Sequence, residues 1–98
     1  MQFVVTAMDF TDAGALERRM AQREAHLRGV KELIAQGHFL SGGAILDSNG
    51  RMIGSTLHLD FPDRASLDKV LESDPYVRGQ VWDRIDVSEA RFVPITIT

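Results

Sequence analysis

The spacing of apolar residues changes several times along the chain, and each change marks a predicted element. Residues 3–8 are apolar on both alternating faces, which predicts a strand covered on both sides. Residues 13–36 have apolar side chains at helical spacing and are followed by Gly37, a common helix end, so they predict a long helix. Thr11 or Asp12 is placed to cap this helix. Its apolar positions are Leu16, Met20, Leu27, Val30 and Ile34.

A hairpin is predicted next. Residues 39–46 predict a strand that two glycines interrupt, and residues 52–61 alternate between the two faces of a second strand. The Asn49-Gly50 pair between them predicts a type I′ turn, because both residues tolerate a positive φ. One face of the second strand carries Ile53, Ser55, Leu57, Leu59 and Phe61, and the other carries Gly54, Thr56, His58 and Asp60.

The last third of the chain predicts a helix, a short helical turn and a strand. Residues 64–73 form the helix, with Asp63 as its cap. The segment Asp74-Pro75-Tyr76 ends this helix and opens one more turn, which reaches Gly79. Residues 88–97 predict the last strand, because their second half is rich in β-branched side chains.

The order strand, long helix, hairpin, helix, strand is that of the split βαβ, ferredoxin-like motif. We expect one α+β domain over residues 1–98, with a four-stranded antiparallel sheet and both helices on one face. The other face would carry Thr6, Thr56 and His58 among apolar residues, which is too mixed for a solvated surface. Two such sheets packed face to face would cover it, so we expect a homodimer.

Composition and charge argue against several classes of protein. The chain has 98 residues, 44% hydrophobic and 26% charged, which is an ordinary globular balance. Its formal net charge of −3 argues against a nucleic-acid binder, which needs a basic face. It has no cysteine, so no disulfide, thiol nucleophile or zinc ribbon is expected. The first residues predict a strand rather than a signal peptide, and no apolar run suggests a membrane span, so we expect a cytoplasmic protein.

Four stretches stand out by their order and spacing. They are Arg23-Glu24-Ala25-His26-Leu27, Gly42-Gly43-Ala44-Ile45-Leu46, Gly54-Ser55, and Asp74-Pro75-Tyr76 followed by Gly79. Together they resemble the YCII-related proteins of the dimeric α+β barrel superfamily, over nearly the whole chain. The resemblance implies a ferredoxin-like fold, a homodimer and an active site around a histidine and an aspartate, which map onto His26 and Asp74. Members with a known role are linked to the breakdown of small cyclic, often chlorinated aromatic, compounds. The family usually has Gly-Pro where this chain has Gly43-Ala44.

His26 and Asp74 are the candidate catalytic residues. Imidazole titrates near physiological pH, so His26 is suited to general acid or base chemistry, and an aspartate would fix its tautomer. Each residue also has a purely structural interpretation. His26 could be a solvated histidine beside the sheet, and Asp74 could simply cap a helical turn that begins with Pro75.

Five further residues are candidates for substrate binding: Arg23, Gly42, Gly43, Ser55 and Tyr76. Arg23 could hold a carboxylate or phenolate, or extend its charged head into water. The two glycines predict a β-bulge or a close approach of a ligand or neighbouring chain to the backbone. Tyr76 could donate a hydrogen bond to a ligand, or pack with its hydroxyl at the rim. Ser55 resembles a family position near the pocket, with no base identified to make it a nucleophile.

We expect neither a metal nor a cofactor. His26, His38 and His58 lack a short ligand spacing, and the chain has no phosphate-binding glycine loop or dinucleotide fingerprint. His38 follows the glycine that ends the long helix, where we expect an exposed residue.

Two functions remain open at this stage. The first is cofactor-free acid/base chemistry of lyase or isomerase type on a small cyclic organic acid or phenol, with Arg23 holding the anionic group. The second is a non-catalytic module that binds a small molecule or another subunit.

Overall fold

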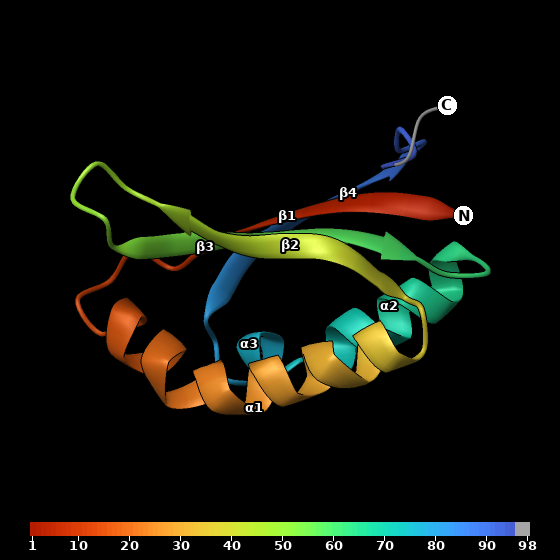
Figure 1. Ribbon diagram of the computed structural model, residues 1–98. Helices are drawn as coiled ribbons and strands as arrows, with labels where there is room; N and C mark the ends of the chain where they lie inside the picture. The colour runs from red at the N-terminus through yellow and green to blue at the C-terminus, as the bar shows by residue number, and fades with distance from the viewer. Residues whose placement is uncertain (96–98) are drawn as a thin grey trace.

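The computed structural model describes residues 1–95 and has one antiparallel sheet with the helices on one side of it (Figure 1). The strands and helices are β1 (Gln2–Asp9), α1 (Ala15–Ala35), β2 (Phe39–Leu46), β3 (Met52–Asp60), α2 (Arg64–Ser73), α3 (Pro75–Arg78) and β4 (Trp82–Ala90). The strand order in the sheet is β2-β3-β1-β4. The predicted ferredoxin-like α+β fold is confirmed.

The hydrophobic core lies between the sheet and the helices. Alternate residues of β1 point to this side, where Phe3, Val5 and Ala7 are buried, while the residues between them are only half-buried. β1 was expected to be covered on both faces, but only the face toward the helices is fully buried. From β3, Leu57 and Leu59 join the core on the face predicted to be apolar. The other core residues are Phe61, Leu67, Leu71, Tyr76, Val81 and Trp82.

α1 turns a partly polar side toward the sheet. Its buried residues include Arg19 and His26, whereas Met20 and Ile34, from the apolar positions that identified the helix, are 51% and 54% exposed. Hydrogen bonds to side chains of the sheet and of the residue before α3 hold the two polar side chains inward. The helix therefore covers a polar site as well as the core.

The first turn of α1 begins later than predicted. Gly14 is the N-cap residue and no side chain caps the helix, so the caps predicted at Thr11 and Asp12 are wrong. Asp12 instead accepts a hydrogen bond from the Gly14 N–H and two from Arg18, at 2.7 and 2.8 Å. It orders the loop before the helix rather than the helix itself.

At α2 the predicted bounds and cap are confirmed. The Asp63 side chain accepts the backbone N–H of Ser66 at 2.7 Å, which satisfies one of the free donors of the first turn. The short turn predicted after Asp74 is α3, which Gly79 ends.

The last strand is β4, so the prediction of residues 88–97 was wrong. β4 pairs along the whole of β1, from Asp9 opposite Trp82 to Gln2 opposite Ala90. Its many charged residues concealed it, because an edge strand can leave them in solvent. Of the strand predicted here, residues 96 and 97 lie outside the described residues.

The hairpin between β2 and β3 is confirmed, but its turn is not of type I′. That turn needs a positive φ at both central residues, and only Gly50 has one, at 81°. The side chain of Asp47 accepts the backbone N–H groups of Asn49 and Arg51 at 2.8 and 3.0 Å. This Asx-type pattern holds Asn49 in the ordinary region of backbone angles.

The other two histidines have structural partners. His38 is half-buried rather than exposed, because its ring stacks on Phe61 and its Nδ1 lies 2.7 Å from the carbonyl oxygen of Asp60. His58 lies on the side of the sheet away from the helices and stacks on Phe92 at 4.3 Å. Within residues 1–95, no helix has the length and apolar character needed to cross a membrane.

Candidate active site

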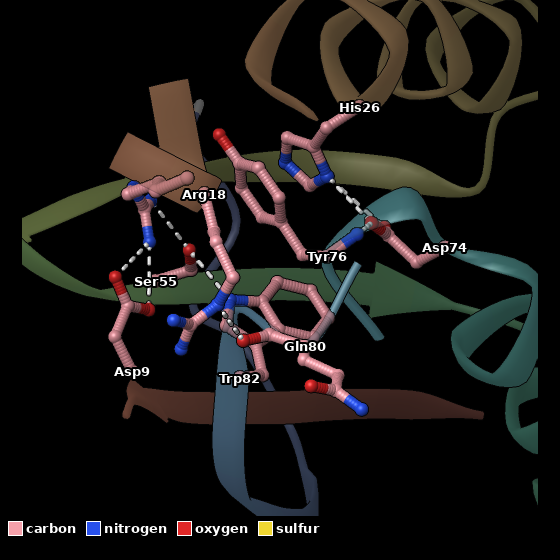
Figure 2. A network of polar contacts seen from close by, with 9 residues as sticks. Asp9, Arg18, His26, Ser55, Asp74, Tyr76, Gln80 and Trp82 are labelled. Carbon is pink, nitrogen blue, oxygen red and sulfur yellow. Dashed lines mark hydrogen bonds and ion pairs between the residues drawn. The ribbon is translucent and has the colours of Figure 1, made fainter. Parts of the chain in front are cut away.

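His26 and Asp74 meet where α1 passes the start of α3 (Figure 2). The Nδ1 atom of His26 lies 2.9 and 3.0 Å from the two carboxylate oxygens of Asp74. Both side chains are largely buried, with 8% and 16% of their surfaces exposed. Because the carboxylate accepts, Nδ1 carries the hydrogen, and Nε2 of the neutral ring keeps its lone pair.

Asp74 also caps α3, so its structural interpretation holds together with its contact to His26. Its Oδ1 atom accepts the backbone N–H of Tyr76 at 2.9 Å, and Pro75 occupies the first helical position. The cap fixes the direction of the carboxylate, which in turn fixes the orientation of the imidazole.

The ring of Tyr76 packs against the histidine and an arginine. His26 stacks on it with 3.9 Å between ring centroids and 13° between ring planes. The guanidinium carbon of Arg19 lies 4.6 Å from the centroid of the same ring. Trp82 meets both His26 and Tyr76 edge-on, at 5.8 and 5.5 Å. This packing holds the imidazole in one orientation.

A second group of polar side chains surrounds Arg19, whose own side chain is only 3% exposed. Its Nη1 atom donates to both carboxylate oxygens of Asp9, at 2.9 and 3.0 Å. Its Nη2 atom donates to the hydroxyl oxygen of Ser55 at 2.8 Å, and Trp82 Nε1 donates to the same oxygen at 3.1 Å. In Figure 2 the ring of Tyr76 lies between this group and the His26–Asp74 pair.

A cavity of about 270 Å³ opens between α1 and the β2–β3 side of the sheet. Its polar wall consists of Arg19, Arg23, His26, Ser55 and Tyr76, and apolar side chains of α1, β2 and β3 form the rest. A volume near the lower end of small-ligand sites and a few convergent polar groups are typical of a pocket for a single-ring molecule.

Six of the seven predicted site residues line this cavity, and the seventh stands behind one of them. The six are Arg23, His26, Gly42, Gly43, Ser55 and Tyr76. Asp74 does not line the cavity but contacts His26 from outside it. Their roles in binding or catalysis stay predictions.

The two glycines differ in what their backbone requires. A Cβ atom on Gly42 would lie 2.6 Å from the Thr56 carbonyl oxygen and 2.9 Å from the ring of Phe39, whereas one on Gly43 would meet nothing within 4 Å. β2 runs through both, and its register shifts lie on either side of them. The bulge predicted at the glycines is therefore absent, and the close approach is that of the neighbouring strand at Gly42.

Arg23 lies on the exposed side of α1 while still reaching the cavity wall. No ion pair of this arginine is found among residues 1–95, although Asp12, Asp9 and Asp68 each hold another arginine. Its guanidinium is placed to meet an anionic group at the cavity mouth.

Burial changes the acidity of two groups in this region. It raises the pKa of the Tyr76 phenol, because the phenolate would lose its hydration, and the nearby Arg19 and Arg23 oppose this only in part. It also raises the pKa of the Asp9 carboxyl, against the opposing charge and hydrogen bonds of Arg19. Tyr76 is therefore a neutral hydrogen-bond donor at neutral pH.

Within residues 1–95, no three histidine or carboxylate side chains come close enough together to hold a metal ion. The polar wall of the cavity offers nitrogen donors and hydroxyl groups instead, which suit an oxygen-bearing organic molecule.

Sequence reasoning missed Asp9, Arg19 and Trp82 as parts of the site. Arg19 lies about two turns before His26 on the same side of α1, and that spacing was the available signal. Asp9 continues the inward alternation of β1. Trp82 had no signal, because the last strand was placed too far along the chain.

A comparison with protein families shows which family this chain belongs to. The YCII-related domain matches residues 1–91. The chain belongs to the YCII-related family. It is 31% identical over 93 residues to Protein YciI of Escherichia coli, which covers 89% of this chain and 93% of that protein. It is 34% identical over 88 residues to an uncharacterized protein of Haemophilus influenzae, which covers 84% of this chain and 88% of that one.

Solved structures share the fold of this YCII-related chain. One is the 5-chloro-2-hydroxyhydroquinone dehydrochlorinase TftG of Burkholderia phenoliruptrix, in complex with 2,5-dihydroxybenzoquinone, with a TM-score of 0.83 and 23% identity over 93% of this chain and 94% of that one. Another is an antibiotic biosynthesis monooxygenase, with a TM-score of 0.52 and 19% identity over 96% and 100% of the two chains. At these identities the likeness establishes the fold.

Proposed function

We propose that this protein is a cofactor-free acid/base enzyme of lyase or isomerase type that acts on a small hydroxylated ring. The observation that carries the proposal is the 2.9 Å contact between His26 Nδ1 and Asp74 in the wall of a ligand-sized cavity. The second ring nitrogen, Nε2, makes no hydrogen bond to any of residues 1–95 and is free to accept a proton from a bound molecule.

The proposed chemistry needs only the movement of a proton. A ring hydroxyl against Nε2 gives its proton to His26, and Asp74 stabilises the imidazolium that forms. In an isomerisation, the proton returns to a carbon of the ring. In an elimination, this proton is first returned to the ring carbon that carries the leaving group, and a second hydroxyl proton and the leaving anion then depart as an acid. Neither reaction requires an electron acceptor.

The substrate class is supported by a protein of the same fold. TftG is named as a dehydrochlorinase of a chlorinated, hydroxylated ring, and its complex contains 2,5-dihydroxybenzoquinone. The cavity of about 270 Å³ suits one ring of this size, and Arg19 and Arg23 give its wall positive charge.

The test is chloride release from 5-chloro-2-hydroxyhydroquinone by the purified protein, His26→Ala and His58→Ala. We expect turnover by the unaltered protein, loss of at least about 10²-fold in His26→Ala, and little change in His58→Ala. His58 is the matched control because it lies on the other side of the sheet, stacked on Phe92. Saturable binding of 2,5-dihydroxybenzoquinone without any turnover would instead favour the non-catalytic binding module.

We also propose a homodimer in which the face of the sheet that carries no helices packs against the same face of a second copy. Half-buried residues of β1 and β3, including Val4, Thr6 and Thr56, lie on this face without helices over them. Two such faces stacked together would remove their apolar atoms from water. Sedimentation should give twice the chain mass at micromolar concentration, and a monomer there would contradict the proposal.

A further inference from the structure

The hydroxyl group of Ser55 is used in an unusual way. Its oxygen accepts one hydrogen bond from Arg19 Nη2 at 2.8 Å and one from Trp82 Nε1 at 3.1 Å. A hydroxyl oxygen has two lone pairs and one hydrogen, so both lone pairs are occupied and only the hydrogen is left. Neither partner can accept it, because guanidinium and indole groups are donors only.

The hydrogen of the Ser55 hydroxyl is left to be donated toward the cavity. Ser55 is only 2% exposed, yet it lines the cavity, and none of the hydrogen bonds among residues 1–95 uses this hydrogen. An acceptor in the cavity, supplied by a ligand, would satisfy it. This arrangement also disfavours Ser55 as a nucleophile, because both electron pairs on its oxygen are engaged by donors.

Arg19 provides a second, independent sign of a missing acceptor. Its Nη1 atom is satisfied by Asp9 and its Nη2 atom by Ser55, but its Nε atom is buried and has no hydrogen-bond partner. Buried donors are nearly always paired in folded proteins, so this unpaired donor, in a residue that lines the cavity, leaves Arg19 short of one acceptor.

The charge around Ser55 determines which acceptor fits best. A hydroxyl that accepts from a cationic guanidinium is polarised, so that its own hydrogen bond is stronger. Arg19 and Arg23 both line the cavity, whereas Asp9 and Asp74 do not line it. A negatively charged oxygen gains most from such a donor.

We propose that Ser55 donates its hydrogen bond to an anionic oxygen of the ligand, a phenolate or a carboxylate, and that Arg19 holds Ser55 in this donor state. The inference rests on the proposed function only in taking this cavity as the substrate site. It assigns the ligand a second oxygen, distinct from the hydroxyl whose proton passes to His26.

The experiment uses 4-nitrophenol as probe, because its phenolate absorbs visible light and its phenol form does not. We expect the bound probe to ionise at a lower pH than the free probe, since the site prefers the anion. Ser55→Ala should bind the phenolate at least tenfold more weakly. Ser41→Ala is the matched control, because this exposed serine of β2 contacts His58 outside the cavity, and its binding should not change.

A second variant keeps the test decisive if Ser55→Ala does not fold. Ser55→Cys fills similar space with a much weaker donor, and circular dichroism checks both folds. It should also lose the shift in the ionisation of the probe. Phenolate binding as tight in either folded variant as in the unaltered protein would overturn the inference, as would no binding of 4-nitrophenolate at millimolar concentration.

His26→Ala separates this inference from the proposed function. We expect this variant to keep its preference for the phenolate while losing turnover of the chlorinated ring. If His26→Ala loses phenolate binding and Ser55→Ala keeps it, the anion lies on the histidine and the Ser55 inference is wrong while the acid/base proposal stands. If Ser55→Ala loses phenolate binding while the unaltered protein turns over no hydroxylated ring, the Ser55 inference stands and the proposal of an acid/base enzyme is wrong.

Discussion

The Oδ1 atom of Asp74 lies 2.9 Å from Nδ1 of His26 and 2.9 Å from the backbone nitrogen of Tyr76. One carboxylate therefore caps α3 and orients the imidazole. The cap holds the aspartate in place before any ligand binds, so the histidine does not depend on the ligand for its orientation. The two roles can be separated by substitution, because asparagine caps helices about as well as aspartate but carries no charge.

Asp74→Asn should retain most of the stability and lose most of the activity. The amide can still accept the Tyr76 N–H, but it cannot stabilise a charged imidazole as a carboxylate does. We expect turnover to fall on the order of 10²-fold or more, and the double variant with His26→Ala to be little worse than either single one. Urea unfolding and chloride release measure the two effects.

Asp74→Ala should lose about 1 kcal/mol or more of unfolding free energy, since the cap is also removed. Asp63→Asn is the matched control, because Asp63 caps α2 without touching the cavity. It should keep full turnover. If Asp74→Asn were fully active while Asp74→Ala was unstable, Asp74 would be a cap only.

Asp9→Asn should be far more damaging to stability than the loss of an exposed partner. Asp9 and Arg19 form a buried pair with 5% and 3% of their side chains exposed, so removal of one charge leaves the other buried. Breaking such a pair costs about 3–5 kcal/mol. The control is Asp68→Asn, whose partner Arg64 lies one turn away on the surface of α2, where a pair contributes roughly 0.5 kcal/mol or less.

Urea unfolding of both variants provides the comparison. A cost for Asp9→Asn no larger than that for Asp68→Asn would mean that Arg19 finds another partner or leaves the site. In that case 4-nitrophenolate binding should also weaken, because Arg19 would no longer hold Ser55 as a donor.

Local patterns predicted most elements of this fold, because their signals are confined to a few neighbouring residues. The bounds of α2 and its Asp63 cap follow from one helical turn of sequence. β4 could not be found in this way. Its edge position is set by pairing with β1, far away in the chain, and its charged residues can remain in solvent there.

The candidate site was only partly predictable. His26 and Asp74 were named as candidates through the resemblance to the family, but the hydrogen bonds between Arg19 and its partners Asp9 and Ser55 join α1 to two different strands. The apolar spacing of α1 indicated a helix, yet Met20 and Ile34 are exposed. Which side a helix buries depends on the partners beneath it, and these polar partners favoured Arg19 and His26.

Gly42→Ala and Gly43→Ala form a matched pair in one strand. A methyl group at Gly42 would clash with the Thr56 carbonyl oxygen at 2.6 Å, and this backbone cannot move without disturbing β3. We expect a loss of roughly 1–3 kcal/mol for Gly42→Ala. Gly43→Ala meets open space and should be neutral or gain up to about 1 kcal/mol, since alanine is the better strand residue.

Thermal unfolding with circular dichroism would rank the two glycine variants. Equal stabilities would show that the strand spacing at Gly42 adapts to a side chain. Gly43 pairs with Thr56, whose side chain lies on the sheet face away from the helices, so the added methyl group should point away from the cavity and leave the binding of 4-nitrophenolate unchanged.

Tyr76 should make the protein less stable in alkaline solution. Burial raises the pKa of its phenol above the ordinary value of 10.0, so the unfolded chain releases this proton at a lower pH than the folded protein. As the pH rises past about 10, the unfolded state binds fewer protons, and the free energy of unfolding falls. Tyr76 is the only tyrosine, so the ultraviolet absorbance of phenolate reports its titration directly.

Tyr76→Phe is the control for this pH dependence, because it keeps a ring to stack on His26 and removes the ionisable hydroxyl. The lysines titrate in the same range in both proteins, so their effect cancels in the difference between the two curves of stability against pH. We expect the unaltered protein to lose stability more steeply than Tyr76→Phe above about pH 10. Parallel curves, or a phenol that titrates at its ordinary pKa in the folded protein, would show that the hydroxyl of Tyr76 reaches bulk water rather than the closed side of the cavity.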